Sequence, residues 1–254
     1  MTAAMGIRIA LLSDVHANLH ALDAVLAHMD AHAGIAARYH LGDLVGYSAF
    51  PNEVVARLGE AGIAGVAGNY DTTIAHGDAH CGCRADTPEQ EALAHLSFTW
   101  TGERVTAATR RALAALPFRM DVRPLGGHVA GPTLRLMHAT PVNNLVYVTE
   151  DRSDDFLRKM AAQAHAAPGD VIAFGHTHKP WTRAVDDILY VNTGSVGRPK
   201  DGDPRAAYVV IAFGAGAPRA EIVRVPYDVM AAKAALEEGG LPGAFGLVLE
   251  SGLA

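Results

Sequence analysis

Five short strand-like runs in this chain are each followed directly by a polar cluster, and this pairing constrains the fold more than any other feature. The runs are Ile7–Leu12, Arg38–Leu41, Ile63–Ala67, Leu134–Met137 and Val171–Phe174. The clusters that follow them are Asp14-Val15-His16, Gly42-Asp43, Gly68-Asn69-Tyr70-Asp71, His138 and Gly175-His176-Thr177-His178. Because open α/β sheets bind ligands in the loops beyond their strand ends, we expect the five clusters to form one site.

The first half of the chain alternates between strand-like and helical patterns. Apolar residues at helical spacing follow Asn18, a favourable N-cap, and predict a helix over Leu19–His32. A proline in the first turn fits a second helix over Pro51–Glu60. Because consecutive parallel strands need a crossover of this kind, we expect the strands of this half to pair in parallel.

The second half is predicted to be mostly β-structure. After a helix near Asp151–His165, strands are expected at Trp181–Val185, Ile188–Val191, Ala207–Phe213 and Glu221–Val225. Tight turns such as Asp186-Asp187 favour antiparallel pairing there. The combination predicts an α/β sandwich with mixed sheets.

A polar, alanine-rich region at about 72–116 interrupts the strand pattern and predicts a helical insertion, with helices near 89–101 and 106–116. No long linker divides the chain, so we expect a single domain over residues 1–254. The tail 239–254 is apolar at Phe245 and Leu249, which predicts that it packs against the rest of the fold.

Charge and hydropathy exclude two classes of partner. The chain has 27 acidic against 21 basic residues, a net charge of −6, and no long basic run, so we expect no stable nucleic-acid binding. No apolar run approaches the roughly 18 residues of a membrane span, so we expect no membrane association.

The two cysteines, Cys81 and Cys83, are too few for a disulfide framework and are expected to be too close to bridge each other. This usage predicts a cytoplasmic protein. His76 and His80 lie nearby and leave a zinc site open as an alternative. We favour an ordinary loop, because Cys-x-Cys is tighter than the usual zinc-binding spacing.

The polar clusters carry the residue types of a dinuclear metal site. Strand side chains alternate, so Asp14 and His16 are expected to point to one side, as are His176 and His178. Each cluster alone is an ordinary surface or turn motif, but five of them after five strands indicate a common purpose. Imidazole and carboxylate without thiolate suit two divalent ions, with Mn preferred and Fe, Zn or Ni as alternatives.

In their order and their residue types, these blocks resemble the signature of the calcineurin-like metallophosphoesterases. Leu41–Tyr47 and Asn192–Pro199 resemble the small prokaryotic phosphodiesterase and dinucleoside-tetraphosphatase-like branch. The resemblance runs from about Ile7 to Tyr208. It implies a four-layer α-β-β-α sandwich with two mixed β-sheets and the metals at one edge.

The resemblance also implies which residues would hold each of the two metals. One metal would be held by Asp14, His16, Asp43 and His178, and the other by Asp43, Asn69, His138 and His176. Asp43 would bridge the two ions. The implied reaction is hydrolysis of a phosphoester by a metal-bridging hydroxide, with Asn69, Tyr70, Asp71 and His138 as the catalytic residues.

One position departs from the family pattern. Many relatives read Gly-Asn-His-Asp in the third block, where the histidine is thought to protonate the leaving oxygen, whereas this chain has Tyr70. A tyrosine with an ordinary pKa near 10 is a poor proton donor at neutral pH, although it can hydrogen-bond a phosphate oxygen. The general acid therefore stays open, with His76 as a minor alternative.

The expected substrate is a small phosphorylated molecule. Arg198 and Lys200 are expected to contact its phosphates or ribose, and Tyr47 and Asn52 to shape the substrate side. Because the histidine is missing, we favour a phosphodiester or nucleotide-like substrate. Alternatives are a dinucleoside polyphosphate hydrolase, a phosphomonoesterase and, from another class, a non-catalytic metal-binding scaffold of the same fold. The sequence does not specify the oligomeric state.

Overall fold

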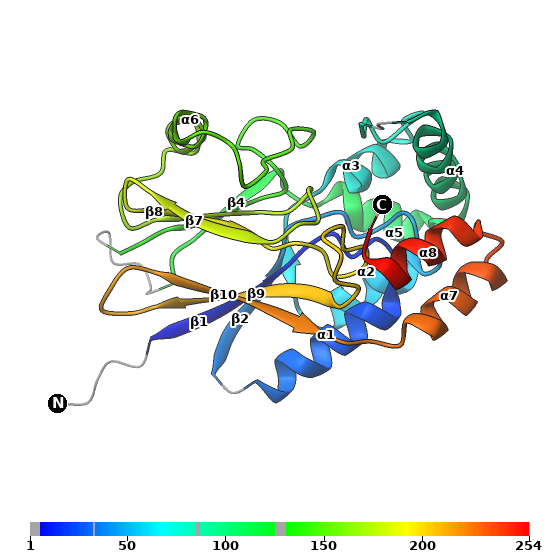
Figure 1. Cartoon of the computed structure of the whole chain (residues 1–254), viewed down its shortest axis with the longest axis horizontal. Coiled ribbons are helices and arrows are strands. Elements are labelled where there is room, and N and C mark those ends of the chain that lie inside the picture. Colours follow the sequence, from blue (N-terminus) through cyan, green and yellow to red (C-terminus); the bar gives the residue numbers. More distant parts are fainter. Residues whose placement is uncertain (1–5, 33, 85–86, 125–130, 254) are drawn as a thin grey trace.

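The computed structural model describes residues 6–32, 34–84, 87–124 and 131–253. Two five-stranded sheets lie face to face, and helices cover their outer faces (Figure 1). Helices α1 (Leu19–Ala31) and α2 (Pro51–Glu60) pack on the first sheet, and α6 (Asp154–Ala164) packs on the second. This is the four-layer α-β-β-α sandwich with two mixed sheets that the resemblance implies.

The first sheet combines strands from both ends of the chain in the order β10-β9-β1-β2-β3. Its strands are β1 (Ile7–Leu12), β2 (Ile35–His40), β3 (Ala64–Gly65), β9 (Ala206–Phe213) and β10 (Arg219–Val225). As predicted, β1 pairs in parallel with β2, and β9 pairs antiparallel with β1 and β10. Strand β3 is shorter than predicted, because Ala67 turns away and donates its N–H to the carbonyl of Pro117 at 2.9 Å.

The second sheet has the order β4-β5-β6-β8-β7. Its strands are β4 (Arg119–Val122), β5 (Leu134–Met137), β6 (Val171–Phe174), β7 (Trp181–Val185) and β8 (Ile188–Asn192). The three central strands are parallel, and β4 and β7 pair antiparallel at the edges. Asp186 and Asp187 have φ of 50° and 59°, which suits a two-residue hairpin turn and confirms the predicted antiparallel pair.

Strand β1 shows how the layers are held together. Ile9 and Leu11 pack into the core between the two sheets, whereas Ala10 and Leu12 pack with the residues of α1. All four side chains are at most 2% exposed. Each large aliphatic side chain buried in this way contributes roughly 1.5–3 kcal/mol to folding. Because successive side chains pack into different layers, the orientation of β1 is fixed. The orientation of the first polar cluster, which follows β1, is fixed with it.

Three helices lie between β3 and β4: α3 (Asn69–His76), α4 (Pro88–Arg104) and α5 (Ala107–Ala114). Helices α4 and α5 match the predicted helices at about 89–101 and 106–116. Helix α3 was not predicted, because its polar sequence has little apolar periodicity. It begins within the third polar cluster and so belongs to the candidate site as much as to the insertion.

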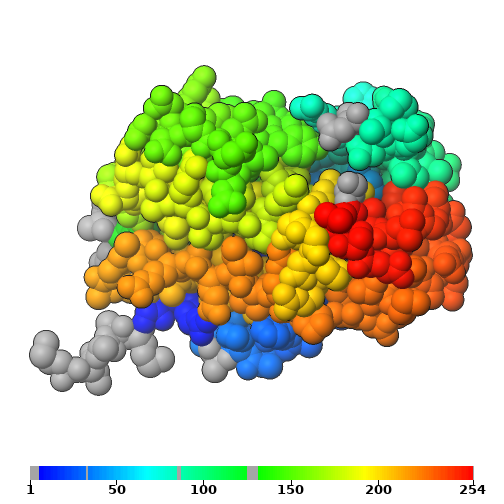
Figure 2. All heavy atoms as spheres, in the orientation of Figure 1, coloured from blue at the N-terminus to red at the C-terminus, as the bar shows by residue number. Residues whose placement is uncertain are grey.

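The C-terminal residues form α7 (Val229–Glu238) and α8 (Gly243–Ser251). Phe245 and Leu249 of α8 are buried with Trp100 of α4, which confirms the packing predicted for this tail. The N–H of Gly202 also donates to the carbonyl of Gly252 at 2.9 Å, and Figure 2 shows the two segments in contact at the surface. The C-terminal helix therefore lies beside the loop that follows β8.

No helix within the described ranges is long and apolar enough to serve as a membrane span.

Candidate metal centre

The five polar clusters meet at one edge of the two sheets. Six of their side chains form two groups, each with ligand atoms within 4.8 Å of one another. One group contains Asp14, His16 and His178, and the other contains Asp43, His138 and His176. All six side chains are buried. Residues from opposite halves of the chain thus contribute to both groups.

The two carboxylates each use one oxygen for support and leave the other facing the histidines. Oδ2 of Asp14 accepts hydrogen bonds from the His176 N–H at 3.0 Å and from the Ser13 hydroxyl, while Oδ1 lies 3.3 Å from Nε2 of His178. Oδ1 of Asp43 accepts from the Tyr70 N–H at 2.9 Å. The second oxygens are therefore oriented toward the centre.

Oδ2 of Asp43 lies between the two groups. It is 3.8 Å from Nε2 of His16 in the first group and 3.5 Å from Nε2 of His138 in the second. A carboxylate oxygen in this place is within reach of both groups at once.

The histidine rings have their tautomers set by backbone carbonyls. Three rings donate an Nδ1–H over 2.6–3.1 Å, namely His16 to Val45, His138 to Leu41 and His178 to Arg198. In the neutral ring this leaves Nε2 with a lone pair. Nε2 of His16 then faces Nε2 of His178 at 3.1 Å, and Nε2 of His138 faces Nδ1 of His176 at 3.1 Å. For His16 and His178 both facing atoms carry lone pairs, which repel at this distance unless a cation lies between them.

Two buried polar atoms in the centre lack a hydrogen-bond partner among the described residues. They are Oδ1 of Asp14 and Nε2 of His176. Buried polar atoms are nearly always paired, so an unpaired carboxylate oxygen and an unpaired imidazole nitrogen at one site need an explanation. A divalent ion bound by nitrogen and oxygen would supply the partner that Oδ1 of Asp14 lacks, so the residues present fit a metal centre.

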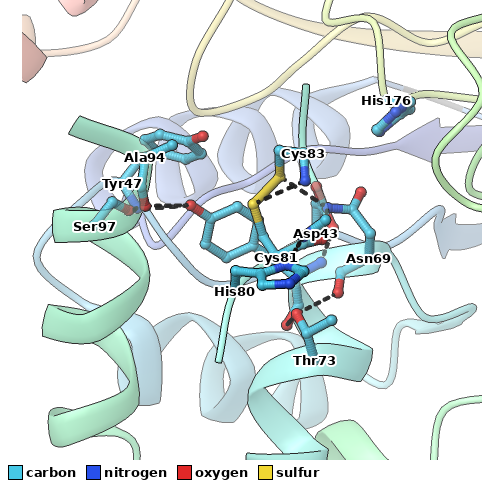
Figure 3. The surroundings of a disulfide bond; sticks show 12 residues. Asp43, Tyr47, Asn69, Thr73, His80, Cys81, Cys83, Ala94, Ser97 and His176 are labelled. Atoms are coloured by element: carbon cyan, nitrogen blue, oxygen red, sulfur yellow. Dashed lines mark hydrogen bonds between the residues drawn. A yellow bond between two sulfur atoms is a disulfide. The ribbon is translucent and has the colours of Figure 1, made fainter. Parts of the chain in front are cut away.

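The amide of Asn69 is oriented by the cysteine loop. Its Nδ2 donates to the carbonyl of Cys81 at 3.3 Å and to Sγ of Cys83 at 3.2 Å (Figure 3). Oδ1 is thereby turned toward Nε2 of His138, 3.1 Å away. Both atoms are acceptors when Nδ1 of His138 carries the proton, so an ion between them would have the Asn69 oxygen within reach.

Cys81 and Cys83 form a disulfide, so the expectation that they are too close to bridge was wrong. Their Cα atoms are 5.3 Å apart, within the usual range for disulfides. Gly82 between them has φ +71°, a conformation that lets the chain turn so tightly. The cysteine spacing favoured an ordinary loop. In the structure this loop is closed by a disulfide, and it contacts Asn69.

The ligand loops have an unusual backbone. Asp14, His16, Asp43, His176 and His178 all have φ between 47° and 66°, in the left-handed region that non-glycine residues rarely adopt. Such conformations cost on the order of 1–3 kcal/mol each and occur where the surrounding structure requires them, often at functional sites. The backbone strain therefore coincides with five of the six residues that form the two groups.

Two glycines in the clusters leave room for the carboxylates. A Cβ on Gly68 would lie 2.1 Å from Oδ1 of Asp43, and a Cβ on Gly175 would lie 2.0 Å from Oγ of Ser13 and 2.4 Å from Oδ2 of Asp14. Both distances are far below contact. Glycine is therefore required at positions 68 and 175, because a larger residue there would clash with the neighbouring aspartates and with Ser13.

The electrostatics keep most of the rings neutral. Burial, and then the charge of His138, lowers the pKa of His176 to about 3, and burial lowers that of His178 to about 4. Burial opposes the charge on His138, but the carboxylates of Asp43 and Asp14 outweigh it and raise its pKa. Burial likewise raises the pKa of Asp43 to about 7. A nearby cation would favour the charged carboxylate and the neutral ring.

Tyr70 and Asp71 lie beside the centre in supporting positions. The Tyr70 side chain is fully buried, and its hydroxyl donates at 3.4 Å to the Ala94 carbonyl and to Ser97 on α4. Burial raises the Tyr70 pKa well above its ordinary value. The hydroxyl is therefore bonded to α4.

Asp71 accepts two backbone hydrogen bonds, from the Leu44 N–H at 2.8 Å and from the Gly68 N–H at 2.9 Å. Both carboxylate oxygens are thus used to tie the loop after β2 to the start of α3. Asp71 lies where it fixes the loops that carry Asp43 and Asn69, and it shows no free oxygen for proton transfer.

The residues expected on the substrate side border a cleft of about 600 Å³. Tyr47, Arg198 and Lys200 all line it. The Arg198 guanidinium lies 4.2 Å from the centre of the Tyr47 ring, and burial lowers the pKa of Lys200 to about 7. Asn52 was misplaced by the sequence analysis, because its side chain bonds to Arg104 and to residues at the start of α5.

Three residues near the centre were not predicted from the sequence. The Tyr147 ring lies 4.3 Å from the His176 ring, Ser13 supports Asp14, and Lys179 lines the cleft. Tyr147 lies in an irregular loop without a motif to mark it. Lys179 follows His178 directly and could have been found from its place in the cluster.

Two mixed sheets with paired Asp/His groups at their strand ends define a class of α/β sandwich proteins with two potential metal-binding sites. A model of the calcineurin-like phosphoesterase superfamily domain matches residues 7–215, and the chain belongs to this superfamily.

Proteins similar along the whole chain include an uncharacterized protein of Methanocaldococcus jannaschii, 28% identical over 251 residues, covering 92% of this chain and 93% of that protein. The crystal structure of a metallophosphoesterase from Sphaerobacter thermophilus is 28% identical with a TM-score of 0.74, covering 98% of this chain and all of the other. A hypothetical protein from Pyrococcus horikoshii shares the fold with 19% identity and a TM-score of 0.79, over 98% of this chain and 100% of its own.

Proposed function

We propose that this protein is a dinuclear metal-dependent phosphoesterase that hydrolyses a small phosphodiester or nucleotide-like substrate. The observation that carries the proposal is Oδ2 of Asp43, which lies 3.8 Å from His16 and 3.5 Å from His138. One carboxylate oxygen within reach of two ligand groups favours two ions that share a ligand.

In the proposed assignment, Asp14, His16, Asp43 and His178 hold one ion, and Asp43, Asn69, His138 and His176 hold the other. The unpaired oxygen of Asp14 and the facing nitrogens of His16 and His178 support it. Two divalent ions in such a centre supply an activated water and neutralise phosphate oxygens during in-line displacement. Mn is the first choice of metal, with Fe, Zn and Ni as alternatives.

The protein's own residues would position and enclose the reaction. Backbone donors hold the supporting oxygens of Asp14 and Asp43, and the carbonyl partners of the histidines keep the ring tautomers fixed. Arg198 and Lys200 add positive charge beside the centre, where a phosphoryl group would lie. The buried side of the centre excludes water from the ligands.

The placement of Tyr70 supports the preference for substrates with good leaving groups. Its hydroxyl bonds toward α4, and Asp71 is occupied by backbone donors, so neither offers a proton to a leaving oxygen. Positioned acid catalysis typically contributes 10²–10⁴-fold, and it matters most when the leaving group is basic. Diesters with acidic leaving groups are therefore favoured over simple alkyl monoesters.

The test is hydrolysis by protein stripped of metal and reloaded with Mn, Fe, Zn or Ni in turn. We expect two ions per chain and hydrolysis of bis(p-nitrophenyl) phosphate that depends on the added metal. Faster turnover of p-nitrophenyl phosphate, or of dinucleoside polyphosphates, would favour the monoesterase or polyphosphate hydrolase instead. Two bound ions without hydrolysis of any of these esters would favour the non-catalytic scaffold.

We also keep the cytoplasm as the proposed location. Two cysteines are too few for a disulfide framework, which supports this location, whereas the Cys81–Cys83 disulfide would meet reducing thiols there. Fractionation of the native host with an antibody to the protein would test the location.

A further inference from the structure

The two cysteines of the chain are joined in one short disulfide beside the candidate metal centre. Cys81 and Cys83 are two positions apart. A disulfide that closes so short a loop removes little freedom from the unfolded chain, so it stabilises the fold less than a bond between distant residues. What the bond fixes is the shape of the cysteine loop, residues 81–83, whose atoms hold the amide of Asn69 (Figure 3).

A cavity of about 780 Å³ opens onto the disulfide. All three residues of the cysteine loop line it, together with residues of α4 such as Glu91 and His95. Its volume is in the range of small-molecule sites. Among the described residues that line it, none belongs to the two ligand groups, and only Ala94 is shared with the cleft of about 600 Å³. A small molecule in this cavity therefore contacts the disulfide and not the metal ligands.

The two sulfur atoms have different surroundings. Cys81 is 5% exposed and packs in the hydrophobic core, whereas Cys83 is half-buried. Sγ of Cys81 accepts a hydrogen bond from the Cys83 N–H at 3.2 Å, which stabilises negative charge on that sulfur. These features favour attack of an incoming thiolate on Sγ of Cys83, with Cys81 as the leaving group.

The sulfur of Cys83 is also the atom that ties the loop to Asn69. Nδ2 of Asn69 donates to it at 3.2 Å, and Oδ1 of the same amide lies 3.1 Å from Nε2 of His138. The backbone of Asn69 is held separately, because its carbonyl accepts from the Thr73 hydroxyl at 2.7 Å in the first turn of α3. A change at Cys83 therefore acts on the side-chain amide of Asn69 and leaves the helix in place.

We propose that the Cys81–Cys83 disulfide is a redox site, which a small dithiol reduces from the cavity, and that its reduction weakens metal binding at the second group. One thiolate of the reductant attacks Sγ of Cys83 and forms a mixed disulfide, while Cys81 leaves with the electron pair of the broken S–S bond. The second thiol of the reductant then displaces Cys83 and closes a disulfide within the reductant. The two thiol protons of the reductant end on Cys81 and Cys83, so the protein gains two electrons and two protons.

Reduction changes the position of a sulfur atom. Two thiols do not stay at the bonding distance of a disulfide, so one of them has to move. Because Cys81 is packed in the core, we expect Cys83 to move and Asn69 to lose the hydrogen bond to its sulfur. The effect on the metals rests on the proposed function, whereas the redox reaction itself needs no metal. In a reducing compartment such as the proposed cytoplasm, disulfides are usually transient and serve catalysis or redox sensing.

The first arm of the test uses metal-free protein and dithiothreitol without denaturant. We expect N-ethylmaleimide to alkylate both cysteines after reduction, counted by mass spectrometry, and the disulfide to form again with oxidised glutathione. Reduction should also shift the NMR signals of the Asn69 side-chain amide, which are identified by their loss in Asn69→Ala. The side-chain amide of Asn52, which donates to the Arg104 carbonyl at 3.0 Å, is the internal control and should not shift.

The second arm measures Mn²⁺ binding to the oxidised and the reduced protein by titration calorimetry, after the reductant has been removed without air. Mn²⁺ suits this comparison because it prefers oxygen and nitrogen ligands to thiolates. The loss of one hydrogen bond predicts about fivefold weaker binding at the second group after reduction, with binding at the first group unchanged. The double variant Cys81→Ser, Cys83→Ser should bind Mn²⁺ equally before and after the same treatment.

A disulfide that excess dithiothreitol leaves intact in the folded protein would overturn the inference. Reduction that leaves the Asn69 signals unshifted, or Mn²⁺ bound equally tightly at the second group, would overturn it as well. Shifted Asn69 signals with no Mn²⁺ bound in either state would instead count against the proposed function and support the redox site.

Discussion

The metal centre and the wall that α4 and α8 contribute to the cleft are held in place by different forces. In the centre, each carboxylate has one oxygen fixed by a backbone N–H, and five ligands have left-handed backbone conformations. In the wall, α4 and α8 meet through apolar contacts such as those of Trp100 with Phe245 and Leu249. The centre thus depends on hydrogen bonds to single polar atoms. The wall depends on the total volume of its packed apolar side chains, so it tolerates exchange of one apolar residue for another of similar size.

The largest effect is expected from Asp43→Asn, because it removes a charge that both ligand groups share. We expect loss of metal from both groups and a fall in turnover of about 10³-fold or more, beyond the 10–100-fold typical of residues outside the ligand set. Metal content by mass spectrometry and turnover on bis(p-nitrophenyl) phosphate are the measurements. Asp155→Asn on the exposed face of α6 is the matched control. Two ions per chain with near-normal turnover would contradict the bridging position.

The next effect tests whether the centre is sterically fixed. In Gly175→Ala the new Cβ would lie 2.0 Å from Ser13 Oγ, so the loop carrying Asp14 must move. We expect destabilisation by about 1–3 kcal/mol, measured by denaturant unfolding, and weaker binding at the first group.

The control for this steric test is Gly59→Ala in α2, where no atom lies within 4 Å of the added Cβ. Alanine is the better helix former, so this variant should be stabilised by up to about 1 kcal/mol. Equal effects of the two substitutions would show that the centre is no more sensitive than a surface helix.

A smaller effect is expected where the wall meets the centre, at the cysteine loop. Cys83→Ala removes the Sγ that accepts from Asn69, so the amide is less well oriented. We expect metal affinity at the second group to fall about tenfold, with turnover recovering at high metal concentration. Titration calorimetry on the apo-protein is the measurement.

The matched variant is Cys81→Ala. It also breaks the disulfide, but Asn69 bonds there to the backbone carbonyl, which remains. We expect a weaker effect than in Cys83→Ala. If the two variants are equally impaired, the disulfide itself and not the Sγ contact orients Asn69.

The smallest effect is expected for Tyr70→Phe. The hydroxyl makes only long hydrogen bonds of 3.4 Å to α4, so its loss should cost about 0.5–1.5 kcal/mol of stability. For the wild-type protein, rates on a series of aryl phosphate esters should fall steeply as the pKa of the leaving group rises. Tyr70→Phe should change these rates about equally across the series. Tyr70→His should flatten that dependence by supplying an acid. A shallow dependence that Tyr70→Phe makes steep would show that the tyrosine already donates the proton.

The contrast between the two regions also explains what the sequence could predict. Asp14, His16 and the other residues of the two groups could be singled out because a metal site demands those residue types, and because short strands place them at fixed positions. Pro51–Glu60 and Leu134–Met137 match the structure residue for residue for a similar reason: a proline start and an apolar run define them locally.

The surroundings of the metal centre could not be predicted in this way. Helix α3 is polar and is held by contacts of the Asp71 carboxylate with two loops, which no local pattern reveals. Tyr147 reaches His176 from an irregular loop. Whether Cys81 and Cys83 meet depends on the positive φ of Gly82, which is a property of the folded loop. These features follow from tertiary contacts and not from periodicity.

The most direct test of the account is a crystal structure of the Mn-loaded protein with anomalous scattering measured at the manganese edge. The account predicts two anomalous peaks about 3.5–4 Å apart, with the Asp43 carboxylate contacting both ions and Asn69 contacting the one nearer His138. A single peak, or two peaks of which only one contacts Asp43, would contradict a centre that shares this carboxylate.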